Sequence, residues 1–151
     1  HEMLKNPNVA AVKNSPMPVQ DIQMFKMDGG EGFVVFNGPD EQLAGGLAMG
    51  ADGGIGGTYG AMPELYLKIF DLVKAGKVEE AAKVQYAADA IIYKMCSAKG
   101  NMYGVIKAIL KIREGLELGG VRKPLANLVD SDMDIVKECV AMIDDAIKTY
   151  C

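Results

Sequence analysis

Val9-Ala10-Ala11-Val12, which ends at Lys13, and Phe33-Val34-Val35-Phe36 are two short, unbroken apolar runs. Helical spacing between Val19 and Met27 separates them. Unbroken apolar runs of this length are typical of strands that are buried on both faces, as in parallel sheets. A right-handed β-α-β crossover joins two parallel strands of one sheet. The two runs therefore predict a parallel α/β fold.

The β/α alternation continues beyond this pair. Asp40 is expected to cap a helix that runs to about Met49. The glycine-rich stretch 53–57 has low strand propensity. We nevertheless expect a strand there, because the β/α alternation requires one at this point and because glycine allows a close backbone approach. The predicted order is β-α-β-α-β-α followed by three more helices.

Helical patterns occupy the chain after Tyr59. Pro63 suits a first helical turn, and Gly76 is expected to end that helix. Ser131 with Asp134 resembles a capping box. The apolar stripes of the four helices are Leu65, Ile69, Leu72 and Val73; Val84, Ala88, Ile91, Ile92 and Met95; Val105, Ile109, Ile112 and Leu116; and Ile135, Val136, Cys139, Met142, Ile143, Ala146 and Ile147.

Composition excludes several classes of protein. The 151 residues carry a formal net charge of −4, which gives no reason to expect a nucleic acid or a membrane as partner. No apolar run approaches the ~20 residues of a membrane span. Cys96, Cys139 and Cys151 are widely spaced, so we expect neither a disulfide framework nor a metal site, and a cytoplasmic location fits best. His1 is the only histidine and is interpreted as a tag remnant.

Three polar or glycine-rich clusters follow the three predicted strands. In parallel α/β folds the carboxyl ends of the strands form the ligand-binding edge, so these clusters are expected to share one rim. The clusters are Lys13; Gly38, Asp40 and Glu41; and Gly56, Gly57 and Thr58.

Lys13 is the sharpest candidate for chemistry. At the end of an apolar strand, desolvation disfavours the charged ammonium, and a neutral amine can attack a carbonyl to form an imine. From spacing alone, a lysine whose head group reaches water from a strand end is the commoner explanation.

The other two clusters also have two interpretations. Gly38-Pro39-Asp40-Glu41 is either a turn with an acidic helix start, stabilised by about 0.3–1 kcal/mol, or a carboxylate pair that binds substrate hydroxyls. The segment 53–58 lacks the Lys-Ser/Thr of a phosphate-binding loop. Glycines that let a ligand approach the backbone explain it better.

Together these segments resemble the N-acetylneuraminate lyase / dihydrodipicolinate synthase family of pyruvate-dependent class I aldolases. Residues 9–15 resemble its lysine-bearing sixth barrel strand, and 36–41 its G-x-D-E segment after strand seven. Residues 50–59 are similar to the lyase strand-eight motif, and 121–125 to an R-x-P motif between the last helices.

The resemblance implies the C-terminal half of a TIM (β/α)₈ barrel, with a C-terminal helical extension. It implies that Lys13 forms an imine with pyruvate without another cofactor. Residues 1–60 would hold the half-barrel β/α units, and 61–151 the last barrel helix and a three-helix extension. The substrate would contact Gly38, Asp40, Glu41, Ile55, Gly56 and Gly57.

Some features depart from the family pattern. Gly57 stands where the lyases usually have a serine, and one extra residue lies between Lys13 and Gly38. The family's G-x-x-G-E loop and catalytic tyrosine belong to strands not seen here, and neither Tyr59 nor Tyr103 matches that tyrosine's motif.

Three functions therefore stay open. The first is cleavage of N-acetylneuraminate, or a similar 2-keto acid, to pyruvate and an aldehyde, favoured by the Asp-Glu pair. The second is a dihydrodipicolinate synthase or a 2-keto-3-deoxy-sugar aldolase. The third is a non-catalytic half-barrel that self-associates, because three strands leave unpaired edges. In each case we expect a homo-oligomer, and we expect the fragment to be inactive alone.

Overall fold

A computed structural model describes residues 2–151, so His1 lies outside the described residues. The chain divides into two compact units. The first unit contains the residues up to Gly56 together with Tyr66–Gln85, and the second contains Gly57–Leu65 and Tyr86–Cys151. Each unit is described by itself.

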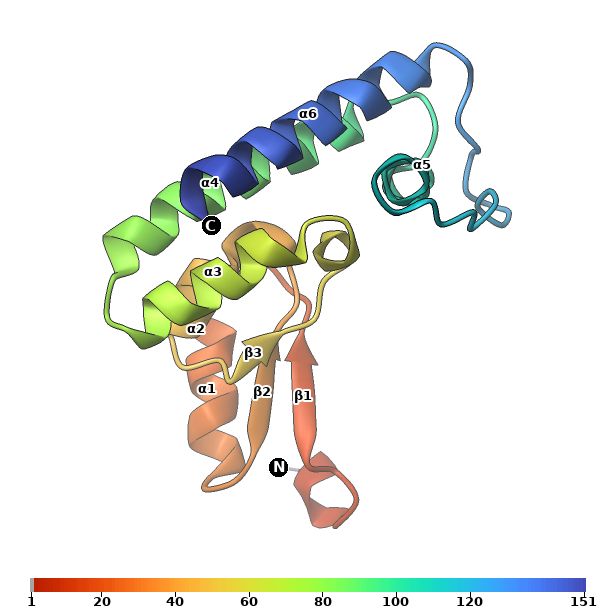
Figure 1. The fold of residues 1–151 in the computed structure, drawn as a ribbon. Coiled ribbons are helices and arrows are strands. Elements are labelled where there is room, and N and C mark those ends of the chain that lie inside the picture. Colours follow the sequence, from red (N-terminus) through yellow and green to blue (C-terminus); the bar gives the residue numbers. More distant parts are fainter. Residues whose placement is uncertain (1) are drawn as a thin grey trace. The chain divides into compact units, whose positions relative to one another are not determined.

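A three-stranded parallel sheet forms the centre of the first unit (Figure 1). Its strands are β1 (Ala11–Asn14), β2 (Val34–Asn37) and β3 (Gly53–Gly54), with β2 in the middle. β1 and β2 are in register from Ala11 opposite Val34 to Asn14 opposite Asn37. The predicted succession of three strands along the chain and their parallel direction are confirmed.

Helices cover one face of this sheet. They are α1 (Gln20–Gly29), the 3₁₀ turn η2 (Asp40–Gln42) and α2 (Leu43–Ala48), and a further 3₁₀ turn, η1 (Met3–Lys5), precedes β1. Val35 of β2 and Ile22 of α1 are fully buried. A Cβ added to Gly46 of α2 would lie 2.3 Å from Oδ1 of Asn37, so α2 packs directly against this face.

Two local predictions for this unit were wrong. Asp40 does not precede a helix as its cap; it is the first residue of η2, because the chain makes a tight turn after Pro39 before α2 begins. β3 covers only Gly53–Gly54 instead of 53–57, since Ile55 makes the last hydrogen bond to β2, from its backbone N–H to the Asn37 carbonyl at 2.9 Å.

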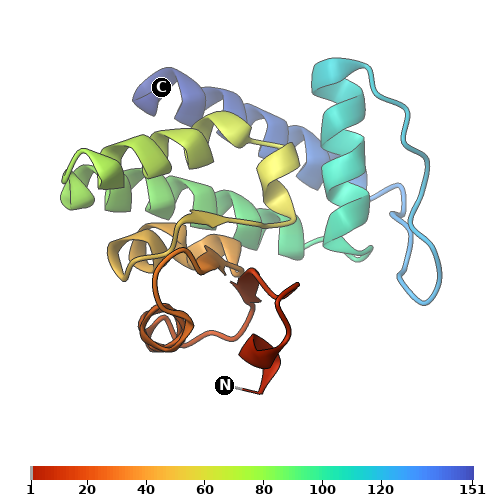
Figure 2. The same cartoon turned by 90° about the horizontal axis from the view of Figure 1, so that it is seen from below.

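The second unit is helical. It contains η3 (Thr58–Gly60), α5 (Met102–Glu114) and α6 (Asp132–Tyr150). α3 (Pro63–Lys74) and α4 (Val78–Cys96) each begin in one unit and end in the other. Figure 2 shows the segment after α5 running back alongside that helix. The fully buried apolar side chains of this unit include Ala61, Met62, Leu65, Ala88, Ile91, Ile92, Met95, Val105, Ile109, Val136, Cys139 and Ile143.

The stripe predicted for α5 was correct only in part. Val105 and Ile109 are fully buried, but Ile112 and Leu116 are each 48 % exposed. Because α5 ends at Glu114, Leu116 lies in the loop beyond it, where the helical spacing no longer applies.

The predicted capping box at the start of α6 was also wrong. Ser131 makes no capping hydrogen bond through its side chain, and Asp134 pairs at the surface with Lys137. The buried carboxylate at the start of α6 is that of Asp132, 1 % exposed, which accepts hydrogen bonds from the backbone N–H groups of Val129, Lys99 and Gly100 at 2.9–3.0 Å, all of them outside the helix.

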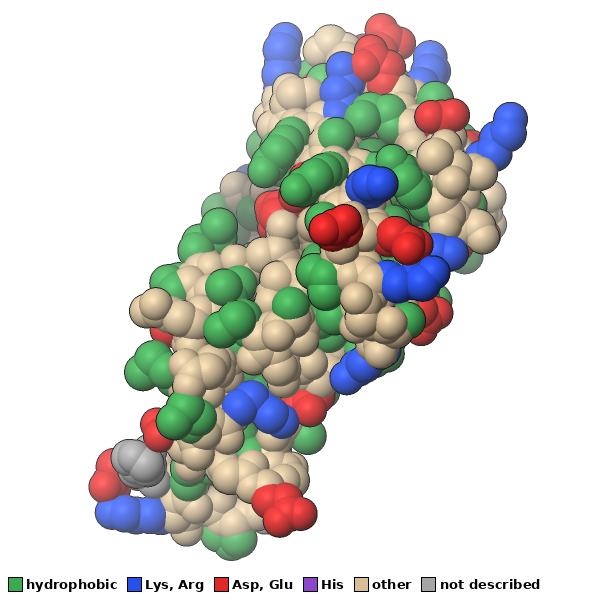
Figure 3. Space-filling view, turned by 90° about the vertical axis from the view of Figure 1, so that its left-hand side faces the viewer, with side chains coloured by type: hydrophobic (Ala, Val, Ile, Leu, Met, Phe, Trp, Pro, Cys, Tyr) green, Lys and Arg blue, Asp and Glu red, His purple; other side chains and the backbone are tan. Residues whose placement is uncertain are grey.

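Charges of both signs alternate over the face drawn in Figure 3, where no large region of one sign appears. Among residues 2–151, no helix combines the length and the hydropathy that crossing a membrane would need.

Candidate functional site

The carboxyl ends of the three strands meet at one edge of the sheet, as the sequence predicts. A Cβ on Gly38 would lie 2.3 Å from the carbonyl oxygen of Asn14 and 2.8 Å from Cα of Ser15. Only glycine allows the end of β2 to come this close to the end of β1. Ile55 joins the end of β3 to β2 through its hydrogen bond to Asn37. This edge is called the rim below.

Lys13 lies one residue before the end of β1, on the sheet face opposite to α2. It is in register with Phe36, and Phe36 is in register with Gly53. The Phe36 ring lies over Gly53, 3.5 Å from where a Cβ would stand. These three residues form one row across the sheet, with the lysine at its outer end.

The predicted desolvation of Lys13 is not found, because its side chain is exposed. The strand alternates between an exposed Lys13 and a buried Asn14. The helices of the first unit cover the Asn14 side of the sheet, and the exposed Lys13 side chain lies on the other face.

The Asp-Glu turn follows β2 and is held on two sides. Nδ2 of Asn37 donates to the Pro39 carbonyl at 2.7 Å. Gln85 of α4 is buried, and its amide group donates to the Asp40 carbonyl and accepts from the Ala44 N–H, both at 3.0 Å. Sequence reasoning missed Gln85. The available signal was a polar residue directly beside Val84 in an apolar helical stripe.

The two carboxylates of this turn differ in exposure. Asp40 is only 8 % exposed, whereas Glu41 is partly exposed. A backbone fixed by Asn37 and Gln85 therefore presents one buried and one accessible carboxyl group directly after β2. Such a pair can accept hydrogen bonds from hydroxyl groups.

The third side of the rim depends on Asp52, which sequence reasoning did not single out. Its backbone N–H donates to the Val35 carbonyl at 2.8 Å, and its carboxylate accepts from the Val35 N–H at 2.7 Å. Lys26 of α1 adds an ion pair at 3.0 Å. The Val35 hydrogen bond and then Lys26 hold the pKa of Asp52 below its usual value. Asp52 thereby fixes the start of β3, while Ile55 and Gly56 follow at the rim, with Ile55 48 % exposed.

Gly57, the last predicted substrate residue, belongs to the second unit. It is exposed and precedes η3, whose first residue, Thr58, is buried. The structure therefore places Lys13, Gly38, Asp40, Glu41, Ile55 and Gly56 in the first unit, and only Gly57 in the second.

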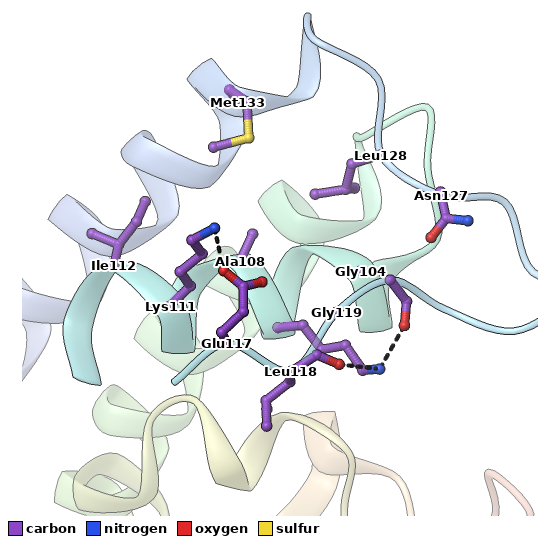
Figure 4. A pocket seen from close by; sticks show the side chains of 12 residues that line it. Gly104, Ala108, Lys111, Ile112, Glu117, Leu118, Gly119, Asn127, Leu128 and Met133 are labelled. Carbon is purple, nitrogen blue, oxygen red and sulfur yellow. Dashed lines mark hydrogen bonds and ion pairs between the residues drawn. The ribbon is translucent and has the colours of Figure 1, made fainter. Parts of the chain in front are cut away.

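The second unit also contains a cavity of about 550 Å³ between α5 and the segment that follows it (Figure 4). Lys107 donates across it to the carbonyls of Leu118 and Gly120, and Lys111 pairs with Glu117. Both lysines therefore tie the loop to the helix and are engaged in structural contacts.

Cys139 is the buried thiol of the second unit. Burial raises the pKa of the Cys139 thiol to about 11. At neutral pH it is therefore protonated, and the thiolate that a nucleophile needs is not available.

The fold and the rim together define a parallel β/α protein with a lysine at a strand end. The model of the dihydrodipicolinate synthetase family matches residues 1–143. The chain therefore belongs to this family.

The chain is also similar in sequence and in fold to individual proteins. An N-acetylneuraminate lyase from Mediterraneibacter gnavus is 67 % identical over 149 residues, which cover 99 % of this chain and 47 % of the relative. The wild-type sialic acid aldolase of Ruminococcus gnavus matches with a TM-score of 0.97 and 67 % identity, over 99 % of this chain and 50 % of that one. Its catalytic lysine mutant matches with the same TM-score, 66 % identity, and 99 % and 49 % coverage. The predicted half-barrel fold is confirmed, and the chain spans about half the length of these relatives.

Proposed function

We propose that the complete protein is an aldolase that cleaves N-acetylneuraminate, or a closely similar 2-keto acid, to pyruvate and an aldehyde. The observation that carries this proposal is the row of Lys13, Phe36 and Gly53 next to the rim that presents the Asp-Glu turn. The 67 % identity to an N-acetylneuraminate lyase favours this substrate over those of the other branches.

In the proposed reaction, Nζ of Lys13 attacks the keto carbon of the open-chain substrate, and water leaves to form an imine. The bond between C3, the carbon attached to the imine carbon, and the hydroxyl-bearing carbon C4 then breaks. Its electron pair moves into the imine and gives an enamine, and the proton of the adjacent hydroxyl leaves as the aldehyde forms. Protonation of the enamine and hydrolysis of the imine release pyruvate and restore the lysine, so no metal or further cofactor takes part.

The rim would bind the two ends of the substrate. Asp40 and Glu41, on a turn fixed by Asn37 and Gln85, would accept hydrogen bonds from hydroxyl groups of the sugar part. The backbone around Ile55, Gly56 and Gly57 would line the substrate closely. The lack of side chains at the two glycines supports this assignment.

The activity is proposed for the complete barrel only. In residues 2–151 the Lys13 side chain is exposed. An imine-forming lysine works best when it is partly desolvated, because burial favours its neutral form. The relatives are about twice as long as this chain. We therefore propose that the other half of the barrel covers this face, that residues 1–151 alone do not turn over, and that the enzyme is a cytoplasmic homo-oligomer.

The test is release of pyruvate from N-acetylneuraminate by the complete protein, measured with a coupled dehydrogenase. Lys13→Ala should lower kcat by at least ~10³-fold, because no other group of the rim can form the imine. Lys83→Ala removes an exposed lysine from α4 and serves as the control that keeps wild-type activity. Wild-type turnover by Lys13→Ala would disprove the proposal.

A further inference from the structure

Gln85 is a buried amide in an apolar part of α4, and it belongs to the first unit. Its side chain is 5 % exposed, while the adjacent Val84 is 1 % exposed and Ala81, one turn earlier, is fully buried. A buried amide is costly unless hydrogen bonds in the protein replace those that it makes with water. A leucine or methionine would fill a helix position of this kind without that cost, so the amide itself calls for a reason.

The reason lies in the Asp-Glu turn, which the Gln85 amide meets at two points. Nε2 donates to the Asp40 carbonyl, and Oε1 accepts from the Ala44 N–H, both at 3.0 Å. Ala44 lies in the first turn of α2, where no carbonyl of that helix can accept its N–H. The two anchor points therefore need one donor and one acceptor, and a glutamine side chain carries both on one planar amide.

The two hydrogen bonds hold both ends of a short stretch that begins with Glu41. Only residues 41–43 separate the two anchor points, Asp40 and Ala44. Because a peptide bond is planar, an Asp40 carbonyl that is held by Gln85 also fixes the plane that contains the backbone nitrogen and Cα of Glu41. The side chain of Glu41, which is partly exposed, therefore starts from a fixed point of the backbone.

The elements that Gln85 holds differ from the element that carries the proposed nucleophile. The Gln85 amide bonds to η2 and α2, whereas Lys13 lies in β1. Imine formation takes place at Lys13, and recognition of hydroxyl groups is assigned to the turn. A change at Gln85 is therefore expected to affect these two parts of the reaction differently.

We infer that Gln85 is a positioning residue whose amide fixes the backbone from which the Glu41 carboxylate reaches substrate hydroxyls, and that it thereby sets the preference for polyhydroxylated substrates. This inference rests on the proposed function, which assigns the turn to the sugar part of the substrate. Gln85 is buried and acts through the turn, so it does not touch the substrate itself. Its loss should weaken the binding of hydroxyl-rich substrates and leave imine formation at Lys13 intact.

The first test compares two substrates in the complete protein. Gln85→Met keeps an unbranched side chain of similar size and removes both hydrogen bonds, so the space stays filled while the turn loses its anchors. We expect kcat/KM with N-acetylneuraminate to fall about 10- to 100-fold, mainly through KM, because small displacements of binding groups have effects of this size. A short 2-keto acid that lacks the distal hydroxyls should show no such fall.

Two further variants complete this test. Gln23→Met is the matched control, because it removes a glutamine amide whose contact, with Met27, stays within α1. It should leave kcat/KM unchanged with both substrates. Gln85→Asn takes the place of Gln85→Met if the latter does not fold. It keeps a donor and an acceptor on a side chain that is one methylene shorter and cannot reach both anchor points, so the same substrate-selective loss is expected.

Wild-type kcat/KM of Gln85→Met on N-acetylneuraminate would overturn the inference, because packing alone would then account for Gln85. An equal loss on both substrates would overturn it as well, because Gln85 would then support the fold as a whole. Borohydride trapping of pyruvate separates these results from failure of the proposed function. We expect wild type and Gln85→Met to trap pyruvate to the same extent, whereas absence of trapping in the wild type overturns the proposed function and the inference with it.

A double-mutant cycle tests whether Gln85 acts through Glu41. Glu41→Ala removes the carboxylate that Gln85 is inferred to position, and it should itself raise KM for N-acetylneuraminate. In the Glu41→Ala background, Gln85→Met should therefore cost much less in kcat/KM than it costs in the wild-type background. Fully additive losses would show that the two residues act independently and would contradict the inference.

Discussion

Gly38 determines how closely the ends of β1 and β2 approach. Its φ is not in the left-handed region, so the glycine is required by contact and not by backbone conformation. The neighbouring atoms are the carbonyl oxygen of Asn14 and Cα of Ser15, which are backbone atoms that no side-chain rotation can move away. Lys13 is bonded to Asn14, so this contact also fixes the position of the proposed nucleophile.

Gly38→Ala is therefore expected to destabilise the protein by about 2–3 kcal/mol and to reduce activity, because the added methyl forces the strand ends apart. The matched control is Gly45→Ala in α2, where a Cβ would meet only Val19 at 3.8 Å. The free energy of unfolding of that variant should rise by about 0.5–1 kcal/mol, because alanine has a higher helix propensity than glycine. Urea unfolding measures both. An unchanged free energy of unfolding in Gly38→Ala would show that the rim is not packed as described.

At the residue scale, sequence reasoning could predict that the candidate residues follow the strands, but it missed the residues that hydrogen-bond to their segments. Lys13, Gly38 and Asp40 stand at ends of apolar runs, and that position can be read from the chain. Gln85 lies 45 residues from Asp40, and only the folded chain brings them together. The exposure of Lys13 was likewise not predictable, because it depends on which elements cover the sheet and not on the strand itself.

At the scale of the elements, the segment just before α5 is held by a single carboxylate, that of Asp132. Asp132 accepts hydrogen bonds from the backbone N–H groups of Val129, Lys99 and Gly100. These bonds join the segment before α5 to the segment before α6. The hydrogen bond from Val129, followed by that from Lys99, lowers the pKa of Asp132 from its ordinary 3.8. A sequence pattern that favoured Ser131 could not show this, because two of the three donors come from about 30 residues away.

The lowered pKa gives a pH dependence with a definite sign. A carboxyl group whose pKa is depressed in the folded state stabilises the fold at pH values above its pKa in the unfolded state. This stabilisation is lost as the pH falls through the pKa of the folded state. Asp132→Asn should therefore lower the melting temperature at pH 7, and its difference from wild type should shrink below about pH 4.

The control for this experiment is Asp134→Asn, whose side chain is 84 % exposed and pairs only at the surface with Lys137. It should leave the melting temperature nearly unchanged at both pH values. A deficit of Asp132→Asn that stays constant from pH 7 down to pH 3 would contradict the role assigned to the Asp132 charge.

At the scale of the whole molecule, the described sheet has two edge strands, since β1 and β3 each pair only with β2. The parallel direction and the first two strands followed from the apolar runs at 9–12 and 33–36. The third strand was predicted from the expected alternation and not from propensity, which explains why its length was overestimated. The division at residue 60 remains a prediction.

Unpaired edges favour pairing with another chain. Residues 1–151 produced alone should therefore form an oligomer. Size-exclusion chromatography with light scattering over a dilution series measures this directly. A stable, compact monomer at all concentrations would contradict it.

The central claim is that Lys13 forms an imine with a keto acid. The direct measurement is mass spectrometry of the complete protein after treatment with pyruvate and borohydride, followed by peptide mapping. We predict one reduced pyruvate adduct on the peptide that contains Lys13, present in Lys83→Ala and absent in Lys13→Ala. No adduct on the wild-type protein, or the same adduct after Lys13→Ala, would contradict the account.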